Sequence, residues 1–208
     1  MTKSKVSKLF SLLFAFAFIF VIGNSTASAS EALTQEQKEA LHKQYVEILD
    51  EVKSTVVWGD SLTDIEVAPI ENHKDSDWVS PEVFKQRAID ATQANAVELK
   101  NTGIQLFGTD SASHKIGISH GNGVTATLTV GATFTTQTVS GRQVFSNYSN
   151  LSVTSNTGTW TTTGVDARII DGGRTFTFNI GGKLTYLNLN TFHTLSTDFL
   201  CSSGGAVS

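Results

Sequence analysis

Cysteine and charge are both scarce in this sequence. Its 208 residues include one cysteine, Cys201, so no disulfide can form within the chain. Charged side chains make up 16% of the residues and the formal net charge is −4, a balance that argues against binding to nucleic acid. The chain is nevertheless 39% hydrophobic and 9% aromatic, which is enough for a sizeable core and excludes a disordered protein.

One long apolar run stands at the start of the chain. Three lysines precede an apolar segment over residues 9–22, and Ala27-Ser28-Ala29 follows it. A basic segment, a short apolar segment and an Ala-x-Ala sequence are together typical of a secretory signal peptide. The apolar segment is shorter than the roughly 20 residues that a membrane-spanning helix needs. We therefore predict a signal peptide over 1–29 and a secreted, extracellular mature chain.

Cleavage after residue 29 would change the charge of the chain. Twelve basic side chains would remain against nineteen acidic ones, a net charge of about −7. The Phe-rich leader and the scarcity of cysteine resemble the exported proteins of Gram-positive bacteria. Cys201 could join two copies of the chain by a disulfide, but we favour a buried thiol that closes the last strand. Exported chains seldom keep an exposed free thiol.

The two parts of the mature chain differ in composition. Residues 30–102 carry most of the charge, whereas residues 103–208 contain no glutamate and are rich in Thr, Ser, Gly and Asn. Such a shift predicts a boundary between two regions near residue 102.

The first region is predicted to form a helix, a strand and a second helix. Thr34-Gln35-Glu36-Gln37 is a capping box, and an apolar stripe continues from it to a helix end near Lys53. Ile65-Glu66-Val67-Ala68 alternates as a short strand does. Ser80-Pro81-Glu82 begins the second helix, for which Gly103 is the expected terminator.

The second region is predicted to be an antiparallel β domain. Apolar and polar residues alternate without interruption over 124–135, and about six strands fit between the turn signals. The fold class is therefore α+β: an N-terminal helix–strand–helix region, 30–102, followed by an all-β antiparallel sandwich or small barrel, 103–208. The turn signals are Asn122-Gly123, Ser140-Gly141, Asn156-Thr157-Gly158, Asp171-Gly172-Gly173 and Gly181-Gly182.

One short segment has a catalytic resemblance. Val56-Val57-Trp58-Gly59-Asp60-Ser61-Leu62-Thr63-Asp64 resembles the first block of the GDSL (SGNH) esterase family, in which the serine is the nucleophile. That family also has a Gly-x-Asn-Asp block and a late Asp-x-x-His, and this sequence contains neither. We therefore expect a turn at this point, and keep an esterase that uses Ser61 and Asp60 as an alternative.

Metal and cofactor sites are not expected. His114 and His120 lie near Asp110, but metal sites normally need three or four ligands, and the two histidines would have to converge across a bend or from adjacent strands. The polar segment over 72–77 lacks the spacing and closing glutamate of a calcium loop, so it is predicted to be a solvated loop.

These patterns favour binding over catalysis. A complete export signal and a complete β pattern occur without a complete catalytic constellation. We expect a secreted, non-catalytic extracellular protein that binds a cell surface, a glycan or a protein partner through its β domain. Tyr148 and Trp160 are the candidate contact residues. The second alternative is a membrane-active, β-pore-forming protein, since alternating apolar and hydroxyl-bearing strands also occur in such proteins.

Overall fold

The computed structural model describes residues 32–99, 110–119 and 124–208. The predicted signal peptide, the boundary near residue 102, the turn at Asn122-Gly123 and His120 lie outside these residues. Within the described ranges, no helix is both long and apolar enough to cross a membrane. Leu33–Ser208 form one compact unit.

The two predicted helices are confirmed at their N-termini. In α1 (Gln35–Thr55), Thr34 Oγ1 accepts a hydrogen bond from the Gln37 N–H, and the Gln37 side chain accepts one from the Thr34 N–H. In α2 (Pro81–Thr92), the Ser80 side chain accepts a hydrogen bond from the Val83 N–H. The predicted end of α2 near Gly103 is wrong, because the residues after the helix form a strand, β2 (Asn95–Leu99), that pairs with β3 (Asp110–Ser119).

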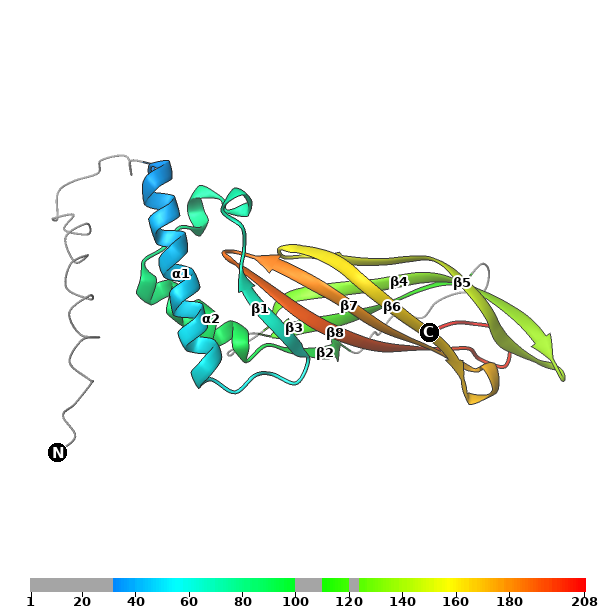
Figure 1. Cartoon of the computed structure of the whole chain (residues 1–208). Coiled ribbons are helices and arrows are strands. Elements are labelled where there is room, and N and C mark those ends of the chain that lie inside the picture. Colours follow the sequence, from blue (N-terminus) through cyan, green and yellow to red (C-terminus); the bar gives the residue numbers. More distant parts are fainter. Residues whose placement is uncertain (1–31, 100–109, 120–123) are drawn as a thin grey trace, which may run out of the picture. The chain divides into compact units, whose positions relative to one another are not determined.

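Eight antiparallel strands of the described residues form two four-stranded sheets (Figure 1). One sheet has the order β1-β8-β7-β6 and the other β2-β3-β4-β5. The predicted α+β class is confirmed, and the β part is a sandwich. The strands are β1 (Leu62–Val67), β2 (Asn95–Leu99), β3 (Asp110–Ser119), β4 (Val124–Val139), β5 (Arg142–Ser155), β6 (Thr159–Ile170), β7 (Thr175–Tyr186) and β8 (Leu189–Leu200).

Most of the predicted turns are confirmed, but one is wrong. Ser140 and Gly141 join β4 to β5 with φ values of 50° and 80°, as a tight hairpin requires. The predicted turn at Gly181-Gly182 does not exist, because β7 continues through both glycines. A Cβ atom on Gly182 would lie 2.1 Å from the Trp160 ring on the neighbouring strand, so the glycine makes room for the indole.

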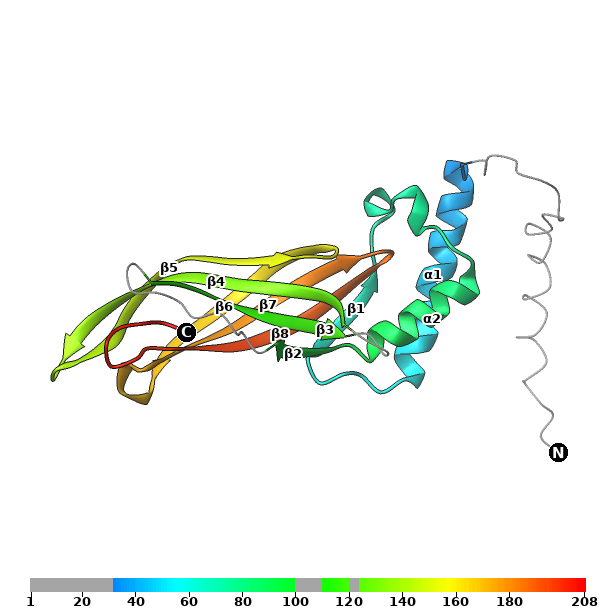
Figure 2. The same ribbon diagram turned by 180° about the vertical axis from the view of Figure 1, so that it is seen from behind.

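Two hydrophobic clusters stabilise the molecule. The larger cluster fills the space between the sheets and contains five mutually packed phenylalanines: Phe134, Phe145, Phe176, Phe178 and Phe199. Cys201 is also buried in it, as predicted, with 2% of its surface exposed. The smaller cluster packs α1 and α2 against Ile65 of β1 and Leu189 of β8. The reverse view in Figure 2 shows the same arrangement, with both helices beside β1 at one end of the strands.

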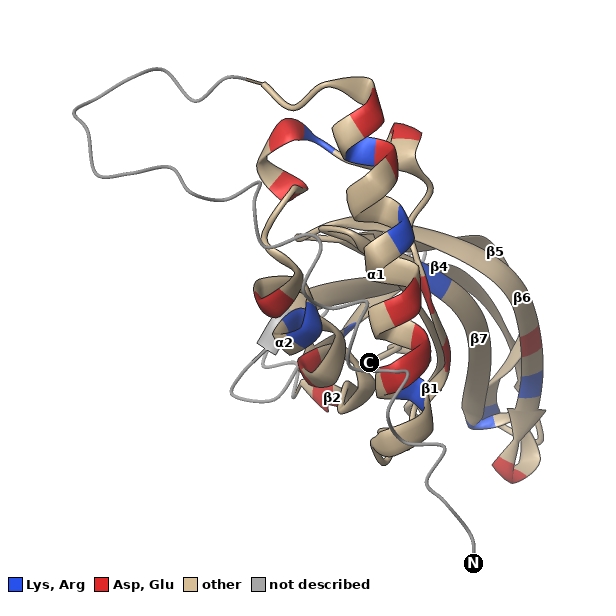
Figure 3. Cartoon of the chain, turned by 60° about the vertical axis from the view of Figure 1, so that its left-hand side comes forward, with Lys and Arg blue, Asp and Glu red and all other residues tan. Residues whose placement is uncertain are grey.

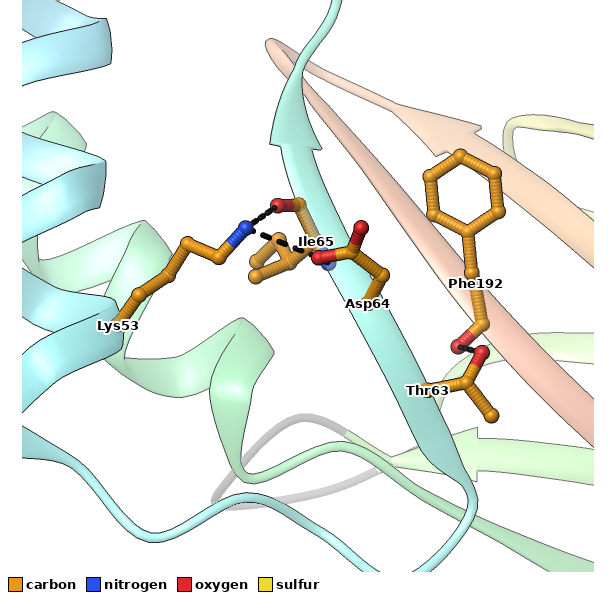
Figure 4. A network of polar contacts seen from close by, with 5 residues as sticks. All are labelled: Lys53, Thr63, Asp64, Ile65 and Phe192. Atoms are coloured by element: carbon orange, nitrogen blue, oxygen red, sulfur yellow. Dashed lines mark hydrogen bonds and ion pairs between the residues drawn. The ribbon is translucent and has the colours of Figure 1, made fainter.

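Polar contacts also fasten the end of α1 to β1 (Figure 4). Lys53 Nζ lies 2.9 Å from Asp64 Oδ1 and donates a hydrogen bond to the Ile65 carbonyl oxygen over 3.0 Å. The hydrogen bond from Lys53 lowers the pKa of the Asp64 carboxyl group, and the Ile65 N–H contributes in the same direction. On the other side of β1, the Thr63 hydroxyl donates to the Phe192 carbonyl oxygen of β8. β1 is thereby held between the helices and β8.

Candidate functional site

The serine of the esterase-like segment lies in a turn that links the two sheets. Ser61 Oγ accepts a hydrogen bond from the Ala96 N–H at 2.7 Å, and the Asp60 N–H donates to Asn95 Oδ1 at 2.8 Å. A Cβ atom on Gly59 would lie 2.1 Å from the Ala94 carbonyl oxygen, so this close approach requires glycine. These hydrogen bonds therefore hold the segment, which leads into β1 of one sheet, against the start of β2 in the other sheet.

A serine nucleophile also needs a base within hydrogen-bonding reach. His193 lies on β8 opposite Leu62, the residue after Ser61. Its side chain is buried, with 1% exposed, and its Nε2 is 2.9 Å from Thr191 Oγ1. A substrate cannot reach a ring buried to this extent without movement of the sandwich. The geometry thus favours a structural role for Ser61.

Tyr148 and Trp160 both pack against the sandwich core. The Tyr148 ring on β5 makes edge contacts with Phe176 and Phe178, with centroids 5.2 and 4.9 Å apart. The Trp160 ring covers Gly182, and its Nε1–H donates to Thr162 Oγ1 at 3.0 Å. Both rings are half-buried, so part of each remains open to contact from outside.

The outer face of the sheet β2-β3-β4-β5 presents a grid of hydroxyl groups. Alternate residues of β4, including Leu128 and Val130, are buried in the core, so the residues between them point away from it. The strand register aligns three outward-facing rows across β3, β4 and β5: Ser111–Thr133–Ser149, Ser113–Gly131–Ser152 and Lys115–Thr129–Thr154.

Hydrogen bonds order part of this hydroxyl grid. Ser111 Oγ and Thr133 Oγ1 are 3.0 Å apart across β3 and β4, and Ser152 Oγ donates to the Gly131 carbonyl oxygen at 3.5 Å. A hydroxyl group both donates and accepts, so these rows can bind a partner that also carries hydroxyl groups. Lys115 is the one charged residue in the three rows. Figure 3 shows the same contrast: the charged residues gather on the helices and their connections, whereas β4, β5 and β7 are mostly uncharged.

A second candidate site is a pocket beside α1. Its volume is about 430 Å³, and it is bordered by the connection between β1 and α2, which includes the short helices η2 (Ile70–Asn72) and η3 (Asp75–Asp77). This connection is less solvated than predicted, because His73 is half-buried and Asp77 is buried. The lining residues are Gln35, Lys38, Ile70, Glu71, His73 and Trp78.

Three buried nitrogen atoms at this pocket have no hydrogen-bond partner among the described residues. They are both ring nitrogens of His73 and the indole nitrogen of Trp78. The two rings are in edge contact, with centroids 4.7 Å apart, and the His42 ring lies 5.7 Å from His73. Burial lowers the pKa of His73, and the neighbouring His42 lowers it further. His73 therefore stays neutral to a lower pH than a free histidine does.

A third polar cluster connects the two sheets. His114 Nδ1 on β3 is 2.6 Å from Glu98 Oε1 on β2 and 2.9 Å from Thr197 Oγ1 on β8. The Thr197 hydroxyl also donates to Glu98 Oε1, and the His114 ring stacks on Phe199. Both partners contact the same ring nitrogen, so this is not the arrangement in which a histidine activates a hydroxyl group through its other nitrogen. Across the described ranges, no three His, Cys, Asp or Glu residues gather in a group that could hold a metal ion.

The fold and these contacts define a general class: an antiparallel β-sandwich with two helices packed against the β1 edge of one sheet. Comparison with protein-family models, curated proteins and solved structures finds no match for this chain. The hydroxyl grid was not predicted as a site, although the alternation over 124–135 was the signal for it. That alternation places threonines on one face of β4, but only the register brings serines from β3 and β5 beside them.

Proposed function

We propose that this chain is a secreted, non-catalytic binding protein whose β domain recognises a glycan on an extracellular surface. The hydroxyl grid on β3, β4 and β5 is the observation that supports this proposal. Its rows repeat the hydrogen-bonding chemistry of a polysaccharide, and they are spread over neighbouring strands rather than enclosed in a pocket. An open array of this kind suits a long or insoluble partner better than a small molecule.

The low charge of the grid indicates how binding would depend on ionic strength. With Lys115 as the one cation in the three rows, few ion pairs can form with the partner. Hydrogen bonds between neutral groups are screened little by salt, so we expect binding to persist at high ionic strength. An acidic polymer held by lysines would instead be released.

The test is sedimentation of the chain that begins at residue 30 with intact bacterial cells, purified cell wall, insoluble glycans or liposomes. We expect the protein to pellet with a glycan-containing target. Thr133→Val keeps the shape of the side chain and removes the hydroxyl group, so it should weaken binding by roughly three- to tenfold, from about 1 kcal/mol per hydrogen bond. Thr194→Val is the matched control, since Thr194 is exposed on β8 in the other sheet.

Each remaining outcome counts against the proposal. Pelleting with liposomes alone would support the membrane-active alternative. Failure to pellet with any target would remove surface binding, and an equal loss in Thr133→Val and Thr194→Val would move recognition away from the grid. Hydrolysis of short acyl esters that disappears in Ser61→Ala would support the esterase alternative.

A further inference from the structure

β6 is a long strand at the end of its sheet, and no strand of the described residues pairs with its outer side. It spans Thr159–Ile170 and pairs with β7 alone in the order β1-β8-β7-β6. Nearly all of its residues are exposed, including Val165, Ile169 and Ile170 at 42%, 41% and 43%. The outer N–H and C=O groups of such a strand are able to pair with another strand. Apolar side chains beside such an edge favour that pairing.

The other three edges of the sandwich differ from β6. β1 and β2 are short, and the helices pack against β1. β5 is long, but its pairing with β4 is irregular at two places, and Asn150 within it has a φ of 53°. Such irregularities disfavour the addition of a further strand. The pairing of β6 with β7 is irregular only between Thr162 and Gly164, so residues 164–170 form a regular edge.

The sequence of this regular edge is complementary to itself. If two copies are paired antiparallel about Ala167, Asp166 of one copy lies opposite Arg168 of the other, and the reverse pair forms as well. The same register places Val165 opposite Ile169 on the other face of the strand. Two opposite-charge pairs and two apolar pairs thus surround the central alanines.

The side chains are already on the faces that this register needs. Arg168 Nη2 lies 2.8 Å from Asp166 Oδ2 within one chain, so both charged groups occupy the same face of β6. They remain about half exposed or more, at 68% and 50%, and are therefore available to a second pair of charges. Ala167, on the opposite face, packs against the sandwich core. In the paired state the four charges alternate in sign, and the apolar residues extend the inner surface of the sheet.

We propose that a second copy of this chain binds along residues 164–170 of β6, in antiparallel orientation about Ala167. The two four-stranded sheets β1-β8-β7-β6 then become one sheet of twice that width, and the interface has two-fold symmetry. This pairing is separate from any disulfide through Cys201, which is buried. It also does not involve the hydroxyl grid on β3, β4 and β5.

Charge reversal provides a test that does not depend on loss of folding. The chain that begins at residue 30 is examined by sedimentation velocity over a range of concentrations, in the presence of a reducing agent. We expect a concentration-dependent dimer. Arg168→Asp places like charges opposite each other in both pairs, and so does Asp166→Arg. Each change should raise the dimer dissociation constant by about tenfold or more.

Two combinations should recover the dimer. The double change Asp166→Arg with Arg168→Asp restores opposite charges, and a mixture of the two single variants should form a heterodimer. Arg142→Asp, at the exposed start of β5, is the matched control and should dimerise like the unaltered chain. A monomer at every concentration would overturn the proposal. So would single variants that dimerise normally, or a mixture that stays monomeric.

Discussion

The hydroxyl group of Ser61 illustrates how one side chain can appear catalytic in the sequence and be structural in the fold. Its hydrogen-bond partner is the N–H of Ala96, at the start of β2. The backbone carbonyl oxygen of Ser61 accepts a hydrogen bond from the Thr194 N–H of β8. Ser61 therefore contacts strands of both sheets, and its contribution should be measurable as stability.

We expect Ser61→Ala to lower the free energy of unfolding by about 1–3 kcal/mol, because the Ala96 N–H loses its acceptor in a half-buried place. Urea unfolding followed by circular dichroism measures this change. Ser146→Ala is a suitable control, since that exposed serine donates to the Thr135 carbonyl oxygen and water can replace it. Unchanged stability in Ser61→Ala would contradict the structural role.

Residue-scale features were predictable where both partners are close in sequence. Thr34 and Ser80 cap helices by contacts within three residues, and both were identified. The partners of Ser61 and His114 lie on strands that are distant in sequence, so no local pattern indicates them. Gly181-Gly182 shows the same limit, because the pair suggested a turn. Gly182 is instead explained by Trp160, which is distant in sequence and packs on it from the neighbouring strand.

At the scale of elements, α1 contacts β1 and the connection over η2 and η3 through groups that titrate in different pH ranges. Tyr45 on α1 donates to the Val79 carbonyl oxygen and accepts from the Val79 N–H, a clamp that does not change near neutral pH. His73 and Asp64 do titrate at lower pH. Both have a lowered pKa, but for opposite reasons: burial disfavours the charged histidine, and hydrogen bonds from Lys53 and Ile65 favour the charged aspartate.

The two groups predict a loss of stability in two stages as the pH falls. Below the ordinary histidine pKa of 6.5, the unfolded chain takes up a proton that folded His73 resists, so stability declines from there toward the lowered folded pKa. Asp64 stabilises the fold above the ordinary aspartate pKa of 3.8, and that contribution is lost as the pH falls through its lowered folded pKa. Urea midpoints measured between pH 3 and pH 8 would show both stages.

Single variants separate the two stages of this pH dependence. His73→Phe should flatten the profile below pH 6.5 and leave the acidic stage in place. Asp64→Asn should remove the acidic stage and leave the decline below pH 6.5 in place. A profile of the unaltered chain that is flat between pH 5 and pH 7 would show that His73 protonates without cost to the fold.

At the scale of the whole molecule, the structure combines the two compositional regions in a way that the sequence did not predict. The helix–strand–helix part and the count of about six strands within 103–208 were predictable because hydrophobic periodicity is local, but β2 was not. Their assembly was not, because it depends on β1 pairing with the last strand, β8, and on β2 pairing with β3. The two regions therefore share both sheets. Asn188, which is fully buried, adds to this connection by donating to the Asp77 carbonyl oxygen and accepting from Arg87.

Shared sheets predict that Leu33–Ser208 unfold as one cooperative unit rather than region by region. In a Trp160→Phe variant, fluorescence reports on Trp58 and Trp78, which pack against the helical cluster, while far-ultraviolet circular dichroism reports on the helices and strands together. The urea midpoints of the two signals should coincide. Asn188→Ala in the same background leaves Arg87 and the Asp77 carbonyl oxygen without this partner, so it should lower both midpoints together. A fluorescence transition at distinctly lower urea than the circular dichroism transition would show that the helices separate first, and that β1 contributes little to holding them on the sandwich.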